Sequence, residues 1–353
     1  MLREEQIKEI RQLLHKSQNP LFFFDNDIDG LASFLLLQRF IGRGKGVAIK
    51  SFPELSEGYV RKLYELRPDI VFVLDKPLIE KSFLDSASQL GIPVVWIDHH
   101  PLQNIEEVYG VYYFNPLQDK KPTSEPVAYW CQKIASKEED LWIAMLGCIG
   151  DWFLPDFTEQ FKKQWPGLLD AENAGDALYK SELGKISRIL DFALKDRTSA
   201  VVKMLKWLAT VKSPYELLEE NDATKSIYKR FKQINAKYSK LLEKAKKFGK
   251  IKNKKVLFFS YGGDLSISGE LANELFYLFP QKIVAVAYTK GSEAKISLRG
   301  AVDIRYLTEK AITNIHGRFG GHKNACAATI ALEDVPKFIE QLEKESEKIN
   351  KTK

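Results

Sequence analysis

Cysteine is scarce in this chain of 353 residues: Cys131, Cys148 and Cys326 are odd in number and lie far apart. Such spacing argues against a disulfide framework and against a zinc site built on cysteine thiolates. We therefore expect the three side chains to be small, buried hydrophobic groups.

Long apolar runs are also missing. No segment approaches the roughly twenty apolar residues that a transmembrane helix needs, and the opening residues 1–6 (MLREEQ) lack the pattern of a signal peptide. These absences predict a soluble, cytoplasmic protein that does not act within a membrane. The apolar content of 44% is nevertheless ample for folding, and the length predicts two globular units.

Acidic residues are almost absent from one part of the chain. Between Lys225 and Lys255, thirteen Lys or Arg residues accompany the single acid Glu243, so this segment carries a charge of +12 and the rest of the chain −6. A basic stripe on an acidic body is typical of proteins that bind polyanions. A solvated, lysine-rich helix face would explain the stripe nearly as well.

The same stretch has an apolar side. Apolar residues recur at spacings of four and three, which predicts a helix about six turns long, at Ile227, Phe231, Ile234, Tyr238, Leu241, Ala245 and Phe248. This side must be buried either within the chain or in a dimer coiled coil. Packing within the chain is the favoured explanation, and the same apolar side also leads us to expect a homo-oligomer.

Elsewhere, apolar strands alternate with helices. Five strands are predicted over the first third of the chain, at 21–24, 47–51, 70–74, 93–97 and 111–114. This alternation is typical of a doubly wound α/β domain with a parallel sheet. Residues 160–250 show only helical patterns, and the alternation resumes at Lys255. We predict an α/β catalytic domain over residues 1–158, a helical connector over 159–253 and a smaller α/β domain over 254–353.

Three predicted strands end in aspartate. Asp25 follows the first, Asp75 follows the third, and the fourth ends in Asp98-His99-His100. The last triplet alone could be a turn with one hydrogen-bonded histidine. Because parallel strands point the same way, however, their carboxyl ends meet at one edge of the sheet. The repetition therefore favours a cluster of metal ligands.

The segment 25–30 (DNDIDG) places Asp25, Asp27 and Asp29 within five residues, and their charges repel unless cations neutralise them. A calcium EF-hand loop begins in the same way, but here a strand precedes the loop and Leu36 stands at the twelfth position, where an acid is required. A loop from strand to helix fits better.

Together with Asp75, Asp98, His99, His100 and Asp151, this loop brings six carboxylates and two histidines to one edge. That number exceeds what one divalent ion can use. The residues therefore predict a site for two ions, Mn²⁺ or Mg²⁺, that acts on phosphorus.

The order of these motifs resembles the DHH phosphoesterase family with a DHHA1 domain. Within that family the chain is most similar to the RecJ-like single-strand exonucleases, particularly the shorter archaeal relatives. The resemblance covers residues 20–152 and 255–332. It rests on Asp25, Asp27, Asp29 and Gly30, then Asp75, Asp98, His99, His100 and Asp151, and finally Gly320, Gly321 and His322.

The resemblance implies roles for the residues of the first domain. Two Mn²⁺ or Mg²⁺ ions would be bound, with Asp75 between them, by Asp27, Asp29, Asp75, His99 and Asp151. Asp98 would orient a histidine or complete a ligand shell, and His100 would contact the substrate phosphate. Many members carry histidine where this chain has Asp25, although RecJ-type members often carry aspartate. Asp25 is therefore assigned to the metal cluster, but not to one of the two ions in particular.

The resemblance also implies a substrate site in the second domain and an activity. Arg299, Gly320, Gly321 and His322 would hold the end of a strand and face the metals across a cleft. The activity would be hydrolysis of single-stranded DNA or RNA from one end, leaning toward 3′→5′, with release of nucleoside monophosphates during DNA replication or repair. The family also contains hydrolases of short oligonucleotides or cyclic dinucleotides, and structural partners of replication helicases, so both remain alternatives.

Overall fold

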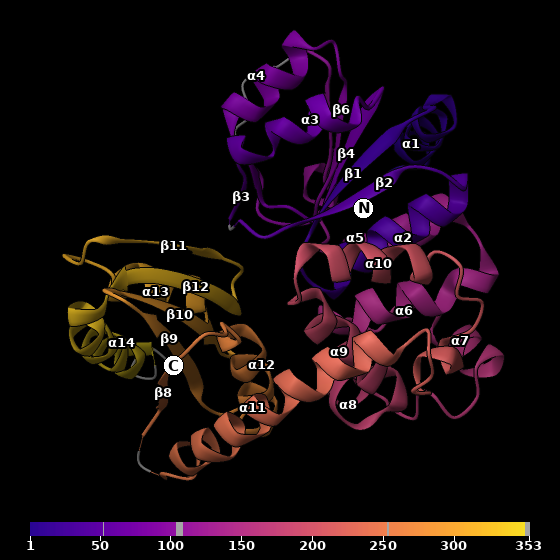
Figure 1. The fold of residues 1–353 in the computed structure, drawn as a ribbon. Helices are drawn as coiled ribbons and strands as arrows, with labels where there is room; N and C mark the ends of the chain where they lie inside the picture. The colour runs from indigo at the N-terminus through magenta and orange to yellow at the C-terminus, as the bar shows by residue number, and fades with distance from the viewer. Residues whose placement is uncertain (52, 104–108, 253, 350–353) are drawn as a thin grey trace. The chain divides into compact units, whose positions relative to one another are not determined.

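The computed structural model describes residues 1–51, 53–103, 109–252 and 254–349. The chain forms two compact units, Met1–Lys232 and Gln233–Lys353, and we describe each by itself (Figure 1). Of the two boundaries predicted for the connector, the one at residue 253 lies outside the described residues. Among the helices of the described ranges, none combines the length and the apolar character needed to cross a membrane.

A five-stranded parallel sheet forms the centre of the first unit, in the order β2-β1-β4-β6-β7. The sheet confirms the predicted α/β class. Strands β4 and β6 are buried on both faces, which explains their continuous apolar sequences. The five strands are β1 (Pro20–Asp25), β2 (Lys45–Ile49), β4 (Ile70–Leu74), β6 (Val94–Ile97) and β7 (Val111–Phe114). A separate pair of short strands, β3 (Glu54–Leu55) and β5 (Leu78–Ile79), was not predicted.

Helices cover both faces of this sheet (Figure 1). Alternate residues of β1 point to opposite sides, so Phe22 joins the larger core and Phe23 the smaller one. The larger core contains α1 (Glu4–Lys16), α2 (Ile28–Ile41), α5 (Val127–Ala135) and α6 (Leu141–Gly150). The smaller core contains α3 (Val60–Leu66), preceded by the short 3₁₀ helix η1 (Glu57–Tyr59), and α4 (Lys81–Gln89).

The stretch predicted as helical is helical, and its first part packs into the larger core of the first unit. Phe161, Ile189, Leu194 and Leu208 are all buried there. The helices are α7 (Thr158–Gln164), α8 (Ala174–Lys180), α9 (Glu182–Leu194) and α10 (Thr198–Leu208).

The long helix α11 (Lys225–Gly249) carries the predicted apolar side. Ile234 and Tyr238 are buried as expected, but Leu242 is buried in place of Leu241, and Phe248 is 46% exposed. The prediction was wrong at these two positions. Alternating spacings of four and three give a period shorter than the 3.6 residues of an α-helix, so the predicted positions drift away from the buried side toward the end of the helix. The last buried residue of α11 is Gly249, and a Cβ added to it would lie 2.4 Å from the Phe279 ring.

The second unit is a smaller mixed sheet with helices, in the strand order β11-β12-β10-β9-β8. Of the strand pairs described in this unit, β8 and β9 run parallel and the others antiparallel. The strands are β8 (Val256–Gly262), β9 (Ile283–Lys290), β10 (Glu293–Arg299), β11 (Gly317–Gly321) and β12 (Ala325–Ala331); the helices are α12 (Ser268–Leu278), α13 (Ile304–Ala311) and α14 (Val335–Ile349). Strand β11 was not predicted, because its glycines disfavour a strand until β12 pairs with it.

Candidate metal centre

The carboxyl ends of three neighbouring strands hold the acids of the first unit. Asp25 is the last residue of β1, Asp75 follows β4 and Asp98 follows β6. Asp75 and Asp98 are only 1% and 0% exposed. The backbone of Asp75 has φ +56°, a left-handed conformation that residues other than glycine seldom adopt. Its N–H donates to the carbonyl of Ile97 at 2.9 Å, which fixes the turn where the acid leaves the sheet.

The loop from β1 to α2 positions two further acids. Asp27 is the N-cap of α2, and its Oδ1 accepts a hydrogen bond from the N–H of Gly30 at 2.9 Å. At Gly30 an added Cβ would lie 2.4 Å from the carbonyl oxygen of Asp25, so only glycine allows this close approach. Asp29 is 1% exposed and accepts the N–H groups of Val127 and Ala128, at 2.7 and 2.8 Å. Asp29 therefore also anchors the start of α5.

His99 faces two carboxylates. Its Nδ1 lies 3.2 Å from the carbonyl oxygen of Ser124, and its Nε2 lies 3.3 Å from both Asp75 Oδ1 and Asp151 Oδ2. Burial lowers the pKa of His99, and the neighbouring His100 lowers it further. A neutral imidazole that donates from Nδ1 presents a lone pair at Nε2 toward two acids, an arrangement that a cation stabilises.

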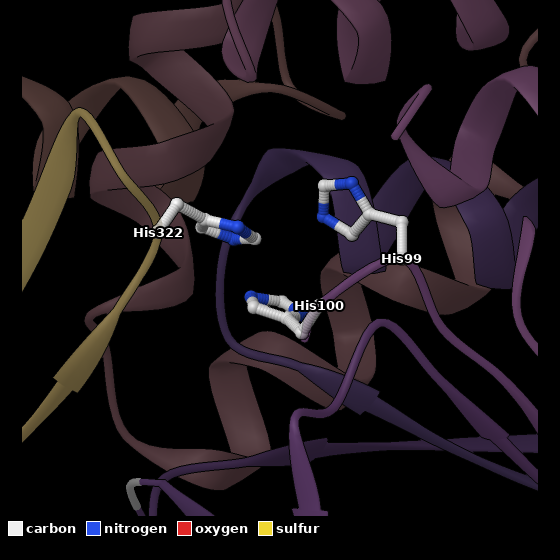
Figure 2. A group of neighbouring side chains, drawn as sticks. All are labelled: His99, His100 and His322. Carbon is white, nitrogen blue, oxygen red and sulfur yellow. The ribbon is translucent and has the colours of Figure 1, made fainter. Parts of the chain in front are cut away.

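His100 forms a pair with Asp98. Its Nδ1 lies 2.7 Å from Asp98 Oδ1, and the rings of His99 and His100 meet edge to face with their centroids 4.7 Å apart (Figure 2). Burial opposes the charged form of His100, but the charge and the hydrogen bond of Asp98 outweigh burial and raise the pKa of His100 above its usual value. The remaining oxygen of Asp98 accepts from the N–H of His100 at 3.1 Å and from Asn115 Nδ2 at 3.3 Å.

The buried acids repel one another in the absence of cations. Burial raises the pKa of Asp27 to about 8, together with the charges of Asp25 and Asp151. Burial and like charges also raise the pKa values of Asp29 and Asp75 well above the ordinary range. Within the described residues, Asp75 Oδ1 is buried and accepts no hydrogen bond. Such acids bind metal ions readily, because a divalent ion removes the repulsion.

Two sets of ligand atoms within this cluster are compact enough for an ion. In each set the atoms lie within 4.8 Å of one another. One set is Asp29, His99 and Asp151, and the other is Asp75, Asp98 and His100. Carboxylate oxygens with imidazole nitrogens suit Mn²⁺ and Mg²⁺. The residues present therefore fit divalent cations.

Asp25 has a partner that sequence reasoning missed. Lys76 is 0% exposed, and its Nζ lies 2.9 Å from Asp25 Oδ1 and 2.7 Å from the carbonyl oxygen of Ser51. The indole of Trp96 donates to the carbonyl of Lys76 at 2.8 Å. A lysine directly after a buried strand and its aspartate was the only signal in the sequence. Asn115, which holds Asp98, was missed as well.

The predicted substrate residues of the second unit lie on β10 and at the turn from β11 to β12. Arg299 ends β10 and donates from Nε to Asn273 Oδ1 of α12. Gly321 has φ +136° and would bring a Cβ to 2.4 Å from the carbonyl oxygen of Ala325, so it shapes the turn. His322 follows it, drawn on the yellow ribbon of Figure 2.

Gly320 differs from Gly321, because a Cβ on Gly320 would meet nothing within 4 Å. Packing therefore does not require glycine at this position. Strand β12 lies between β11 and β10, so Arg299 and Gly320 stand on strands that do not pair with each other.

Family models match both units of the chain. The model of the DHH family, N-terminal domain, matches residues 21–150, and that of the DHHA1 domain matches residues 245–348. A search of curated protein sequences found no match.

Solved structures share the fold across almost the whole chain. RecJ from Thermus thermophilus, in complex with Mn²⁺, is 16% identical with a TM-score of 0.64, over 97% of this chain and 55% of that one. The chain thus spans about half of that protein. An exonuclease RecJ bound to manganese is 18% identical with a TM-score of 0.63, over 98% and 94% of the two chains. CDC45 from Entamoeba histolytica is 12% identical with a TM-score of 0.52, over 96% and 98%.

At these identities the structural likeness establishes the fold, whereas the matched models establish the family. The acids and histidines that the strands bring together in the first unit stand in the part matched by the DHH model, with Asp151 directly after it. The chain therefore belongs to the DHH family, with an N-terminal DHH domain followed by a DHHA1 domain.

Proposed function

We propose that the protein is a metal-dependent phosphodiesterase that degrades single-stranded DNA or RNA from one end and releases nucleoside monophosphates. The observation that carries this proposal is the convergence of acceptors on His99: its Nε2 lies 3.3 Å from Asp75 and from Asp151, and the nearby oxygen of Asp75 is buried. Such a set of acceptors is suited to cations. The fold shared with RecJ exonucleases supports a nucleic-acid substrate.

Two Mn²⁺ or Mg²⁺ ions would be held by Asp29, Asp75, His99 and Asp151. Asp25 and Asp27 would complete the acidic shell. When bound, such ions activate water and stabilise the charge that develops on a phosphoryl group. Asp29 and Asp98 would contribute their carboxylates while holding α5 and His100 in place.

His100 would act on the substrate. Asp98 holds Nδ1 of His100 and raises its pKa, which favours the protonated ring, and that form can donate from Nε2. A hydrogen bond from this nitrogen to a phosphate oxygen would orient the scissile bond, and the same proton could serve the leaving oxygen. Asn115 would keep Asp98 in the orientation that this pair requires.

The second unit would hold the nucleic-acid strand. Arg299, the backbone amides of Gly320 and Gly321, and the imidazole of His322 would offer donors to a terminal phosphate. A cavity of about 580 Å³ supports further phosphate contacts, since it is lined by Phe279 and by Lys250, Lys252, Lys254, Lys255 and Lys282. Lys282 Nζ donates hydrogen bonds to the carbonyls of Ile251 and Lys254.

The test is digestion of oligonucleotides labelled at either end, as DNA and as RNA, in the presence of Mn²⁺. We expect nucleoside monophosphates to be released in the 3′→5′ direction. The variant Asp98→Ala/His99→Ala should lose activity, while circular dichroism shows that it remains folded. Undiminished activity of that variant would refute the site, and release from the 5′ end would overturn the direction.

Two other functions are separated by the same assays. If cleavage stops above about five nucleotides, the basic stripe does not guide a strand, and hydrolysis of short oligonucleotides or cyclic dinucleotides is the better interpretation. If the parent protein has no activity with Mn²⁺ or Mg²⁺, we would favour a role as the partner of a replication or repair helicase. The fold shared with CDC45 is compatible with that role. The retained acids and histidines favour catalysis.

A further inference from the structure

A groove of about 660 Å³ runs along the outer edge of the sheet in the first unit. Strand β2 is an edge strand, since among the described strands it pairs with β1 alone, and Figure 1 shows it at the border of the sheet. Apolar side chains from both sides of the strand form the walls. Phe34, Val201 and Leu205 come from α2 and α10, whereas Tyr59 and Leu66 come from η1 and α3.

The backbone of β2 is open toward this groove. Among the described residues, no side chain, loop or helix hydrogen-bonds to the N–H or carbonyl groups of Lys45–Ile49, which pair only with β1. At Gly46 an added Cβ would lie 2.6 Å from the Phe34 ring, so α2 packs closely against this face of the strand. An exposed edge is a template for another strand unless the protein covers it.

The rim of the groove is basic throughout. Among the described residues, its charged lining side chains are all basic and include no Asp or Glu: Lys45, Lys50, Arg61, Lys62 and Lys206. Lys62 pairs with Glu65, and Lys50 Nζ donates to the carbonyl of Asp196.

The other three cations, Lys45, Arg61 and Lys206, are exposed. These charges would repel the same edge of a second copy. An acidic segment, in contrast, is complementary to them.

We propose that this groove binds an extended, acidic segment of a partner protein, which adds to β2 as a sixth strand. The backbone of the segment would pair with Lys45–Ile49. Its apolar side chains, at alternate positions, would enter the groove beside Val47, Val202 and Leu205, and its carboxylates would meet the basic rim. None of these residues belongs to the metal centre, so the binding does not depend on hydrolysis.

The direct test uses the full chain and an acetylated heptapeptide in which Glu or Asp alternates with Val or Ile. Hydrogen–deuterium exchange followed by mass spectrometry should show slower exchange for residues 45–49 in the presence of the peptide, because strand addition bonds their free amides. The same peptide with alternate backbone amides methylated cannot pair with an edge strand. It should give no protection.

Charge-reversal variants test the rim. We expect Lys45→Glu/Arg61→Glu/Lys206→Glu to weaken the peptide affinity, measured by fluorescence anisotropy, by at least about tenfold. The matched control reverses three exposed lysines of the same unit that do not line the groove, namely Lys8→Glu/Lys163→Glu/Lys203→Glu. The control should remain within about twofold of the parent.

Three results would overturn the proposal. One is unchanged exchange at residues 45–49 with millimolar peptide. A second is an equal loss of affinity in both triple variants, which would indicate nonspecific attraction. The third is protection of residues 45–49 by AMP or by a single-stranded oligonucleotide and not by the peptide, which would make the groove a nucleotide or nucleic-acid site.

Discussion

At the scale of single residues, a buried ammonium group neutralises one acid of the cluster. Lys76 is fully buried and bonds to Asp25, whose side chain is 17% exposed. Replacing Lys76 by methionine keeps the volume but leaves the carboxylate without its cation. Because breaking a buried ion pair from one side is costly, we expect Lys76→Met to lower the free energy of unfolding by about 3 kcal/mol, measured by urea denaturation with EDTA present.

The double variant Lys76→Met/Asp25→Asn is the control. Removing the stranded charge should restore part of the lost stability. Equal stability of the single and double variants would show that the pair contributes little.

The stability of the metal-free protein should depend on pH through Asp27. Its pKa is raised from 3.8 to about 8 in the folded state, so between these values the folded state binds more protons than the unfolded state. Stability therefore falls as pH rises across this window. Asp29 and Asp75, whose pKa values are also raised, act in the same direction.

We expect urea denaturation with EDTA to give a lower free energy of unfolding at pH 8 than at pH 5. The variant Asp27→Asn should make this dependence shallower, and added Mn²⁺ should increase stability most at pH 8, where the acids are most readily deprotonated. A free energy that rises from pH 5 to pH 8 without metal would contradict the raised pKa values.

At the scale of elements, the turn from β1 into α2 needs a glycine. At Gly30 a methyl group would lie 2.4 Å from the carbonyl oxygen and 2.7 Å from the nitrogen of Asp25. We expect Gly30→Ala to destabilise the protein by about 1–3 kcal/mol and to weaken Mn²⁺ binding in calorimetry, because the turn carries Asp25, Asp27 and Asp29.

Gly269 provides the matched control. It also lies near the start of a helix, α12, but a Cβ there would meet nothing within 4 Å. Gly269→Ala should leave stability unchanged or raise it by up to about 1 kcal/mol. If both substitutions have the same effect, the close approach at Gly30 is not what restricts the position.

The elements also show what can be predicted from the sequence. Unbroken apolar runs predicted β1, β4 and β6, and the acids at their ends predicted the cluster, because a parallel sheet brings such ends together. Strand β11 escaped prediction, since its pairing with β12 and not its composition makes it a strand. Lys76 and Asn115 escaped for a related reason: their roles depend on Asp25 and Asp98, which are distant in sequence.

At the scale of the whole molecule, positive charge is concentrated in the basic stripe, residues 225–255, whereas the rest of the chain is acidic. Lys240, Lys244 and Lys247 are exposed and share one face of α11, because they are spaced by four and three residues. If single-stranded DNA follows this face, replacing all three by glutamine should weaken binding. The slope of log affinity against log salt concentration should become shallower by about 2, as measured by fluorescence anisotropy.

The control for this variant is Lys8→Gln/Lys163→Gln/Lys203→Gln, which removes the same charge from exposed positions outside the stripe. It should leave the slope almost unchanged. An equal change in both variants would mean that net charge, and not the stripe, governs DNA binding.

The buried cysteines give each unit an internal reporter. Cys131 and Cys148 lie in the larger core of the first unit, Cys326 lies in the core of the second, and all three are free thiols. A thiol reagent can reach them only when the surrounding core opens. Tryptic mapping of the labelled cysteines would therefore give the rate at which each unit opens. Both rates would come from one sample of the unaltered protein, without an engineered probe.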